Sequence, residues 1–259
     1  MTGLYDVPRL YDLISPSLAG DDPELAWWRD ACALGGATAG HGEVLELGAG
    51  SGRVAVPLAQ AGLRVTALDL SPAMIARGRE RAEAAGVAGA ITWIEGDMTA
   101  FELGRRFEAI LVAYNTFLHL HTRAQHAATF AAIRRHLAPG GVLALSVVSP
   151  DPHTLGRGPY HRLVVAPPVL DPVEGAVLTV EETIQYDHAT QCTLGQFHFT
   201  YPGRPDFLVV PVDLRMIYPA ELEALVDCHG FDIVRRHGDW DGSQFDSQSL
   251  IQNLACRAR

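Results

Sequence analysis

A glycine-rich segment around residue 50 carries the strongest chemical signal in this chain. Residues 44–52 read VLELGAGSG, so an apolar run passes directly into glycines at 48, 50 and 52. Glycine allows a tight turn and lets a ligand approach the backbone without a Cβ clash. A helix that begins after the turn also offers unpaired N–H groups to that ligand. The segment therefore predicts a cofactor-binding turn between a strand and a helix.

Carboxylates follow the next two apolar runs. Asp69 ends RVTALD, and Asp97 follows ITWIEG. A carboxylate at the end of the strand beside such a turn can accept both hydroxyls of an adenosine ribose. Asp69 could instead cap the next helix, but Ser71 already suits that position. Because NAD and S-adenosylmethionine (SAM) share the arrangement, Asp69 indicates an adenosine ligand without distinguishing the two.

The residue after the last glycine of the turn distinguishes between the predictions of these two cofactors. The dinucleotide fingerprint GxGxxG would need its third glycine where the chain has Arg53. The segment instead resembles the first motif of the class I SAM-dependent methyltransferases, ExGxGxG, at Glu46, Gly48, Gly50 and Gly52. This resemblance implies that the turn, which includes Ala49, lies beneath the methionine part of SAM.

The resemblance covers residues 43–149 and assigns further residues to the cofactor. It implies that Asp69, with Leu70 beside it, binds the ribose and that Asp97 bonds the adenine amino group. It also implies that Met74 and Met98 flank the adenine ring, although Met98 could instead fill the core.

Two more segments match the family in the expected order. The sequence YNTF at 114–117 lies where the family places the transferring methyl group and the substrate, which adds Tyr114 to the cofactor residues and Asn115 to the substrate residues. The sequence LAPGG at 137–141 resembles the structural LxPGG turn of the family.

Short apolar runs and longer amphipathic runs alternate over this region, and they must form the elements that hold these residues. We expect strands over 43–47, 64–68, 91–95, 107–113 and 142–148, and helices over 53–61, 73–85 and 123–137. Alternation of this kind implies right-handed βαβ crossovers. The predicted fold class is α/β: a doubly wound, seven-stranded Rossmann-like methyltransferase sheet.

The pattern changes after residue 149. Apolar runs over 176–186, 192–201 and 207–217 predict antiparallel strands, and a helix over 219–229 precedes strands over 231–237 and 250–257. We therefore expect a single domain with four parts. These are an N-terminal helical cover (1–40) whose Trp27-Trp28 helix packs over the mouth of the sheet, a SAM-binding core (43–149), a β-rich substrate-side insertion (150–217), and C-terminal elements that complete the sheet (218–259).

Composition narrows the function. The 259 residues are 48% hydrophobic and carry a formal charge of −10, with no run of basic residues, which disfavours nucleic acid as a partner. The four cysteines are widely spaced, so neither a zinc site nor a disulfide framework is predicted, and no metal is implied. No run approaches the roughly 20 apolar residues of a membrane span. We expect a cytoplasmic protein with no membrane partner.

Beyond residue 149 the chain looks like bacterial methyltransferases that modify amino sugars and other secondary metabolites. The predicted function is methyl transfer from SAM to an N or O atom of a small-molecule acceptor. Candidate catalytic residues are His119 and His121, as a base or as capping groups, and Tyr11, which could close over SAM or anchor the N-terminal helix. Candidate substrate-binding residues are Asn115, His119, His198 on the inner side of the insertion, and Arg215, which could hold an anionic group or form a strand-end ion pair.

Three alternatives stay open at this stage. A protein or RNA substrate is one, although YNTF departs from the [DN]PP[YF] motif of base amino methylases. A SAM-fold protein that catalyses a non-methylating reaction is the second, and an NAD-dependent oxidoreductase is the third and weakest. A homodimer is compatible with the sequence.

Overall fold

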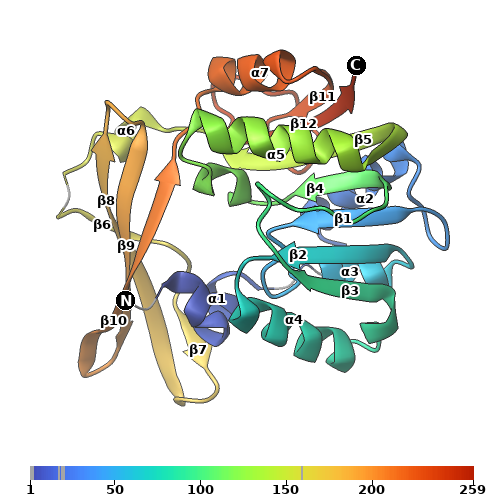
Figure 1. The fold of residues 1–259 in the computed structure, drawn as a ribbon. Coiled ribbons are helices and arrows are strands. Elements are labelled where there is room, and N and C mark those ends of the chain that lie inside the picture. Colours follow the sequence, from blue (N-terminus) through green and yellow to red (C-terminus); the bar gives the residue numbers. More distant parts are fainter. Residues whose placement is uncertain (1–2, 17, 19–20, 159) are drawn as a thin grey trace.

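The computed structural model describes residues 3–16, 18, 21–158 and 160–259. A seven-stranded sheet in the order β11-β12-β5-β4-β1-β2-β3 forms its centre (Figure 1). These strands are β1 (Glu43–Leu47), β2 (Arg64–Asp69), β3 (Ile91–Glu95), β4 (Phe107–Val112), β5 (Leu137–Val148), β11 (Phe231–His237) and β12 (Ile251–Ala258). The first five pair in parallel, whereas β12 is antiparallel to both of its neighbours. The predicted fold class is confirmed.

Helices cover both faces of this sheet, so its central strands are buried on both sides. One core holds α2 (Pro23–Gly35), α3 (Ala55–Gln60) and α4 (Pro72–Ala84), and the other holds α5 (Arg123–His136) and α7 (Pro219–Cys228). Ser71 caps α4 as predicted, because its hydroxyl accepts a hydrogen bond from the N–H of Met74. Short elements complete the connections: η2 (Ala88–Ala90), η3 (Thr116–His119) and α6 (Pro152–Leu155).

The LAPGG segment differs from its prediction. The fifth helix ends at His136, and strand pairing starts at once with Leu137 opposite Phe107. The register then shifts, and Val142 lies opposite Ala109, so Pro139 and the two glycines form an irregularity inside β5 rather than a turn before it.

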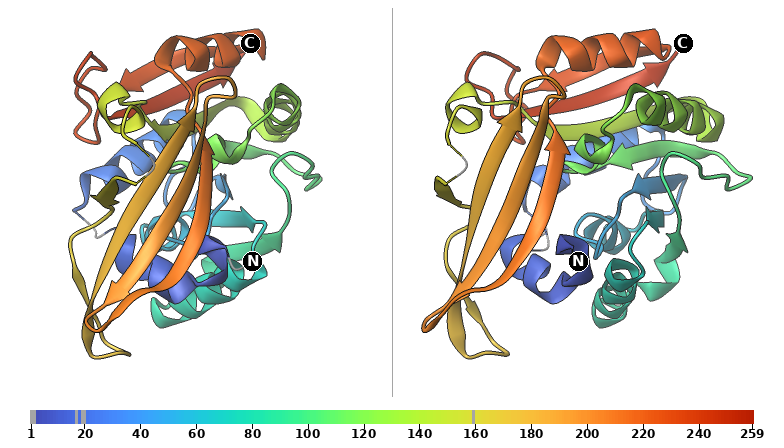
Figure 2. Two further views of the ribbon diagram at one scale, coloured as in Figure 1. Left: turned by 90° about the vertical axis from the view of Figure 1, so that its left-hand side faces the viewer. Right: turned by 60° about the vertical axis from the view of Figure 1, so that its left-hand side comes forward.

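A second, antiparallel sheet stands beside the carboxyl ends of the parallel strands (Figures 1 and 2). Its order is β10-β9-β8-β6, with β7 also paired to β8. The strands are β6 (Arg162–Val164), β7 (Val169–Asp171), β8 (Ala176–Asp187), β9 (Cys192–Tyr201) and β10 (Arg204–Arg215).

The N-terminal elements η1 (Leu4–Asp6) and α1 (Pro8–Ile14) lie between the two sheets (Figure 2). Leu4 and Leu10 bury their side chains among Val180, Phe199 and Val210 of the antiparallel sheet. The other side of this N-terminal pair contacts α4. Residues 4–14 therefore join the antiparallel sheet to the parallel one.

The prediction for the Trp27-Trp28 helix was wrong in its location. This helix, α2, packs on β4 and β5, on one face of the parallel sheet rather than over its mouth. Trp28 is fully buried there, and both tryptophans pack against Trp240 with ring centroids 5.8–5.9 Å apart. Gly35 lies so close to the backbone of Glu108 that a Cβ would not fit between them. The apolar tryptophans gain more from burial in the core than they would at a solvated mouth.

Among the described residues, no helix is long and apolar enough to cross a membrane.

The packing of Trp93 against α4 leads to a stability prediction. A Cβ at Gly78, in the middle of α4, would lie 2.8 Å from Trp93 Cζ2. Gly→Ala in a helix interior ordinarily stabilises by about 1 kcal/mol. Here we expect Gly78→Ala to lower the free energy of unfolding by roughly 1–3 kcal/mol, because the added methyl group overpacks the site. Urea unfolding would measure this change. A gain in stability would contradict the prediction, and the double variant Gly78→Ala/Trp93→Leu should recover part of the loss.

Candidate active site

A cavity of about 300 Å³ opens at the carboxyl ends of the parallel strands, beneath η1 and α1. It brings together most of the residues that the sequence predicted for the site. Its lining includes Tyr11, Gly48, Gly50, Asp69, Leu70, Met74, Asp97, Met98, Tyr114, Asn115 and His119. The lining also includes Leu68, Gly96, Thr116 and Tyr5, which the sequence analysis did not identify.

The glycine turn needs its glycines for two reasons. Gly48 and Gly50 have φ angles of 67° and 55°, in a backbone region that residues other than glycine rarely adopt. A Cβ at Gly48 would also approach Thr116 Oγ1 to 2.9 Å. Thr116 begins η3, so the turn after β1 and the segment after β4 meet at this point. Backbone atoms rather than side chains thus form this wall of the cavity.

The Asp69 carboxylate connects the turn to the end of β2. Its two oxygens accept hydrogen bonds from the N–H groups of Gly50 at 2.7 Å and Ser71 at 2.8 Å. Burial raises the pKa of Asp69, although these N–H groups oppose the shift. Each carboxylate oxygen has a second lone pair, so Asp69 can still accept hydrogen bonds from the hydroxyl groups of a ligand in the cavity.

Three residues of the glycine motif lie outside the main cavity. Glu46 and Ala49 line a smaller adjoining space of about 40 Å³. Glu46 is almost fully buried, and this burial, followed by the charge of Asp69, raises its pKa to about 8. Gly52 makes room for the ring of Trp93, since a Cβ there would lie 2.9 Å from Cη2.

The opposite end of the cavity combines apolar walls with one acid. Met74 is buried, while Leu68 and Met98 add further apolar surface. Asp97 is exposed at the end of β3, and its Oδ1 accepts a hydrogen bond from the N–H of Thr99 at 2.7 Å. A flat aromatic ring with an edge amino group suits such a space.

Two tyrosines of the N-terminal elements complete the cavity. Tyr5 and Tyr11 have ring centroids 5.8 Å apart, and the Tyr5 hydroxyl lies 2.7 Å from Nε2 of His119. Burial, followed by the charge of His121, lowers the pKa of His119 to about 4, so its imidazole is neutral near pH 7. The only local sequence feature that could have indicated a role for Tyr5 is the Tyr-Asp pair at 5–6, which is repeated at 11–12.

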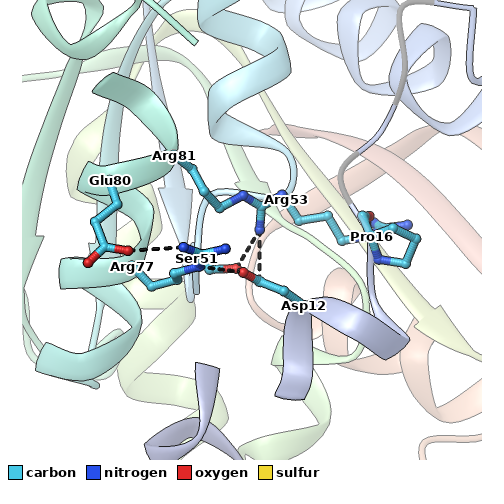
Figure 3. Close-up of polar contacts among 7 residues, drawn as sticks. All are labelled: Asp12, Pro16, Ser51, Arg53, Arg77, Glu80 and Arg81. Atoms are coloured by element: carbon cyan, nitrogen blue, oxygen red, sulfur yellow. Dashed lines mark hydrogen bonds and ion pairs between the residues drawn. The ribbon is translucent and has the colours of Figure 1, made fainter. Parts of the chain in front are cut away.

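A polar cluster holds α1 over the glycine turn (Figure 3). Asp12 accepts hydrogen bonds from the Ser51 hydroxyl at 2.6 Å, from Arg77 Nε at 2.7 Å and from Arg81 Nη1 at 2.9 Å. Arg81 also donates to Ser51 at 2.7 Å. We call Asp12, Ser51, Arg77 and Arg81 the Asp12 cluster. It connects α1 directly to the glycine turn and to α4.

Arg53 has a related role at the position of the missing dinucleotide glycine. Its guanidinium forms a bidentate pair with Glu24 at 2.6 and 2.7 Å, and its Nε donates to the carbonyl of Pro16. The guanidinium also lies 4.9 Å from the ring centroid of Tyr114. Arg53 thus links the N-terminal segment to the residues that precede the helix after the turn. A glycine at this position would have no side chain to form these contacts.

The structure places three candidates away from the cavity. His121 Nε2 lies 3.2 Å from the carbonyl oxygen of Asp213, and Arg215 pairs with Glu221, which is the strand-end ion pair considered above. His198 neighbours the inward-facing Phe199 on β9, so strand alternation points it outward, where it lies 3.0 Å from the Thr183 hydroxyl. The prediction that His198 lines the inner side was therefore wrong.

Asn115 lines the cavity, but its Oδ1 already accepts a hydrogen bond from the N–H of Val148 at 2.8 Å. This bond ties the segment after β4 to the end of β5. The side-chain amide keeps its N–H donors for other partners.

The sequence was compared with known protein families and curated proteins. Residues 44–141 match the methyltransferase domain family. The cypemycin N-terminal methyltransferase of a Streptomyces species is 32% identical over 141 residues, which are 54% of each chain. The dTDP-3-amino-3,4,6-trideoxy-α-D-glucopyranose N,N-dimethyltransferase of Streptomyces venezuelae is 29% identical over 68% of this chain and 69% of its own.

Among solved structures, the CcbJ methyltransferase from Streptomyces caelestis covers nearly the whole fold. It is 26% identical, with a TM-score of 0.79 over 99% of this chain and 98% of its own. In sequence, the chain spans about half the length of the first curated relatives it matches. Residues 44–141 thus form a methyltransferase domain, and the glycine turn, the acidic strand ends and the shared fold of the chain resemble those of the class I SAM-dependent methyltransferases.

Proposed function

We propose that this protein transfers a methyl group from SAM to an amine nitrogen of a small metabolite. The observation that carries the proposal is the Tyr5–His119 hydrogen bond at the mouth of a cavity built from the SAM motifs. The pair lies next to Tyr114, Asn115 and Thr116, where the family holds the transferring methyl group.

The residues present fit SAM. The backbone of Gly48 and Gly50 gives the methionine part room to approach, and the free lone pairs of Asp69 suit the ribose hydroxyls. Met74 and Met98 offer apolar contact to the adenine ring, with Asp97 at its amino edge. When bound, SAM supplies an electrophilic methyl group on a sulfonium, so alignment of the acceptor can account for most of the rate.

The chain's own residues would orient the acceptor and handle its proton. Because His119 is neutral near pH 7, its Nε2 can accept a hydrogen bond from the Tyr5 hydroxyl or from the acceptor itself. Its low pKa makes it a weak base, which suits a neutral amine better than a hydroxyl that must lose its proton. The names of the two curated relatives also favour nitrogen.

The remaining expectations stay proposals. We propose a cytoplasmic protein that does not act on nucleic acid, because the chain is acidic and its basic residues are scattered. We also propose a homodimer that uses the outer face of the antiparallel sheet, where Leu194 and Val209 are exposed. Light scattering of the purified protein would give its mass, and a monomer at micromolar concentration would contradict the dimer.

The first prediction concerns the cofactor. S-adenosylhomocysteine (SAH) should bind and NADH should not, and Asp69→Ala should weaken SAH binding about 10–100-fold, because two charge-assisted hydrogen bonds are lost. Calorimetry would measure both ligands. Glu95→Ala is the matched control, since Glu95 ends β3 opposite Asp69 but lies outside the cavity lining. Equal SAH affinity in Asp69→Ala and wild type would argue against the assignment.

The second prediction separates nitrogen from oxygen acceptors. With an amine acceptor, His119→Ala should lower kcat by about tenfold, because the imidazole only orients the acceptor, whereas a hydroxyl acceptor would make the loss about 10²–10⁴-fold. The rate of SAH release in the presence of each acceptor would measure kcat. A loss in the larger range would overturn the proposal of an amine.

The third prediction concerns the Asp12 cluster. Asp12→Asn removes the charge that Arg77 and Arg81 pair with, so α1 should open more readily and SAH should dissociate about tenfold faster. Stopped-flow fluorescence of the bound complex would give the dissociation rate. Asp6→Asn is the control, because among the described residues the Asp6 side chain bonds only the nearby N–H of Gly3. An unchanged dissociation rate would exclude a role for the cluster in holding the cofactor.

A further inference from the structure

Two adjacent glutamates in β8 must point to opposite faces of the antiparallel sheet, because side chains alternate along a strand. Glu181 pairs with Arg162 on the outer face. Glu182 lies on the same face of β8 as Val180 and Tyr186, because the β8–β9 pairing has no bulge between these residues. Val180 belongs to the core that also holds Leu4 and Leu10, and Tyr186 packs against the core of α5 and α7, so this face is the inner one. Glu182 therefore lies on the inner face of the antiparallel sheet, the face that packs against the N-terminal elements.

Glu182 has an unusual environment for a carboxylate. Within the described part of the chain it forms no hydrogen bond or ion pair, and its neighbours across the sheet are Phe197 and Val210. A Cβ at Gly195 would lie 3.3 Å from its Oε1, so glycine leaves room beside the carboxylate. Burial alone raises the pKa of Glu182 to about 7. A half-buried carboxylate without a partner is costly to a protein unless a ligand supplies the opposite charge.

The position of Glu182 relates it to the candidate active site. Val210, Phe197 and Glu182 form one row across β10, β9 and β8. The strand β10 in turn packs against η1 and η3, which carry Tyr5 and His119. Neighbouring strands are about 4.8 Å apart, so Glu182 stands about 10 Å along the sheet from the strand that contacts these elements. Figure 2 shows this sheet facing the N-terminal elements.

We infer that Glu182 binds a protonated amino group of the methyl acceptor, other than the neutral nitrogen that receives the methyl group. An ammonium ion is the partner that a half-buried, unpaired carboxylate favours most, because it supplies both the missing charge and hydrogen-bond donors. Alkyl amines are largely protonated at neutral pH, with pKa values near that of lysine, about 10.4. The inference rests on the proposed function and makes it narrower: besides the nitrogen that is methylated, the acceptor carries a cationic amino group, and the inner face of β8 recognises that group.

The test is acceptor binding to SAH-saturated protein. The probes are glucosamine, 6-amino-6-deoxyglucose, trialanine and spermidine, each beside its N-acetylated form, with affinities measured by calorimetry. We expect at least one amine to bind wild type about tenfold or more tighter than its acetylated form, and Glu182→Gln to remove this preference while SAH affinity stays the same. Glu181→Gln, which alters the neighbouring outward carboxylate, should behave as wild type.

Several outcomes would overturn the inference. One is a Glu182→Gln protein that still prefers the amine, and another is intact SAH binding without binding of any amine in the panel. Glu182→Leu, whose side chain suits the apolar wall, provides a second variant, and thermal melting would verify that both are folded. A wild-type protein that fails to bind SAH would instead overturn the proposed function, and the inference with it.

Discussion

The carboxylate of Asp69 holds the two halves of the candidate cofactor site together. It receives one N–H from the turn after β1 and another from the start of α4, so two βα connections adopt a single arrangement around it. Both N–H groups lie at points where the chain leaves regular structure and would otherwise lack partners. This one side chain thus joins the turn after β1 to the start of α4.

The N-terminal elements depend on that arrangement in turn. The Asp12 cluster attaches α1 to Ser51 of the turn and to Arg77 and Arg81 of α4, while Leu4 and Leu10 bury themselves in the antiparallel sheet. Arg9 adds an ion pair with Asp171, a carboxylate that is fully buried. A short segment with little core of its own is thereby fixed from both sides, and it carries Tyr5 and Tyr11 into the cavity.

Most of the parallel sheet could be predicted because its signals are local. Apolar runs, the Ser71 cap and the glycine turn each act over a few residues, and β1, β3 and β11 begin and end where the sequence indicated. The failures involve contacts between distant residues. The pattern of apolar residues shows that the helix of Trp27 and Trp28 buries one face, but it does not show against which elements. Its place on β4 and β5 therefore could not be predicted from that pattern.

The candidate site shows the same division. Asp69 and Asp97 follow strands and could be located by position alone, whereas Tyr5 matters only through a partner 114 residues away. His198 was misplaced because alternation gives two faces without saying which one is the inner face. Arg215 could not be assigned from type alone, since Glu221, which satisfies it, belongs to the next helix.

The separation of the two sheets bears on how such a protein diverges. The cavity is built from backbone turns and strand ends between residues 48 and 119 together with Tyr5 and Tyr11, and the sheet that packs behind these N-terminal residues comes from strands between residues 176 and 215. Substitutions on the inner face of those strands can reshape the acceptor side while Asp69 and the glycine turn keep their geometry. Under the proposed function, a lineage could therefore change its methyl acceptor through substitutions in one sheet and keep its candidate cofactor site.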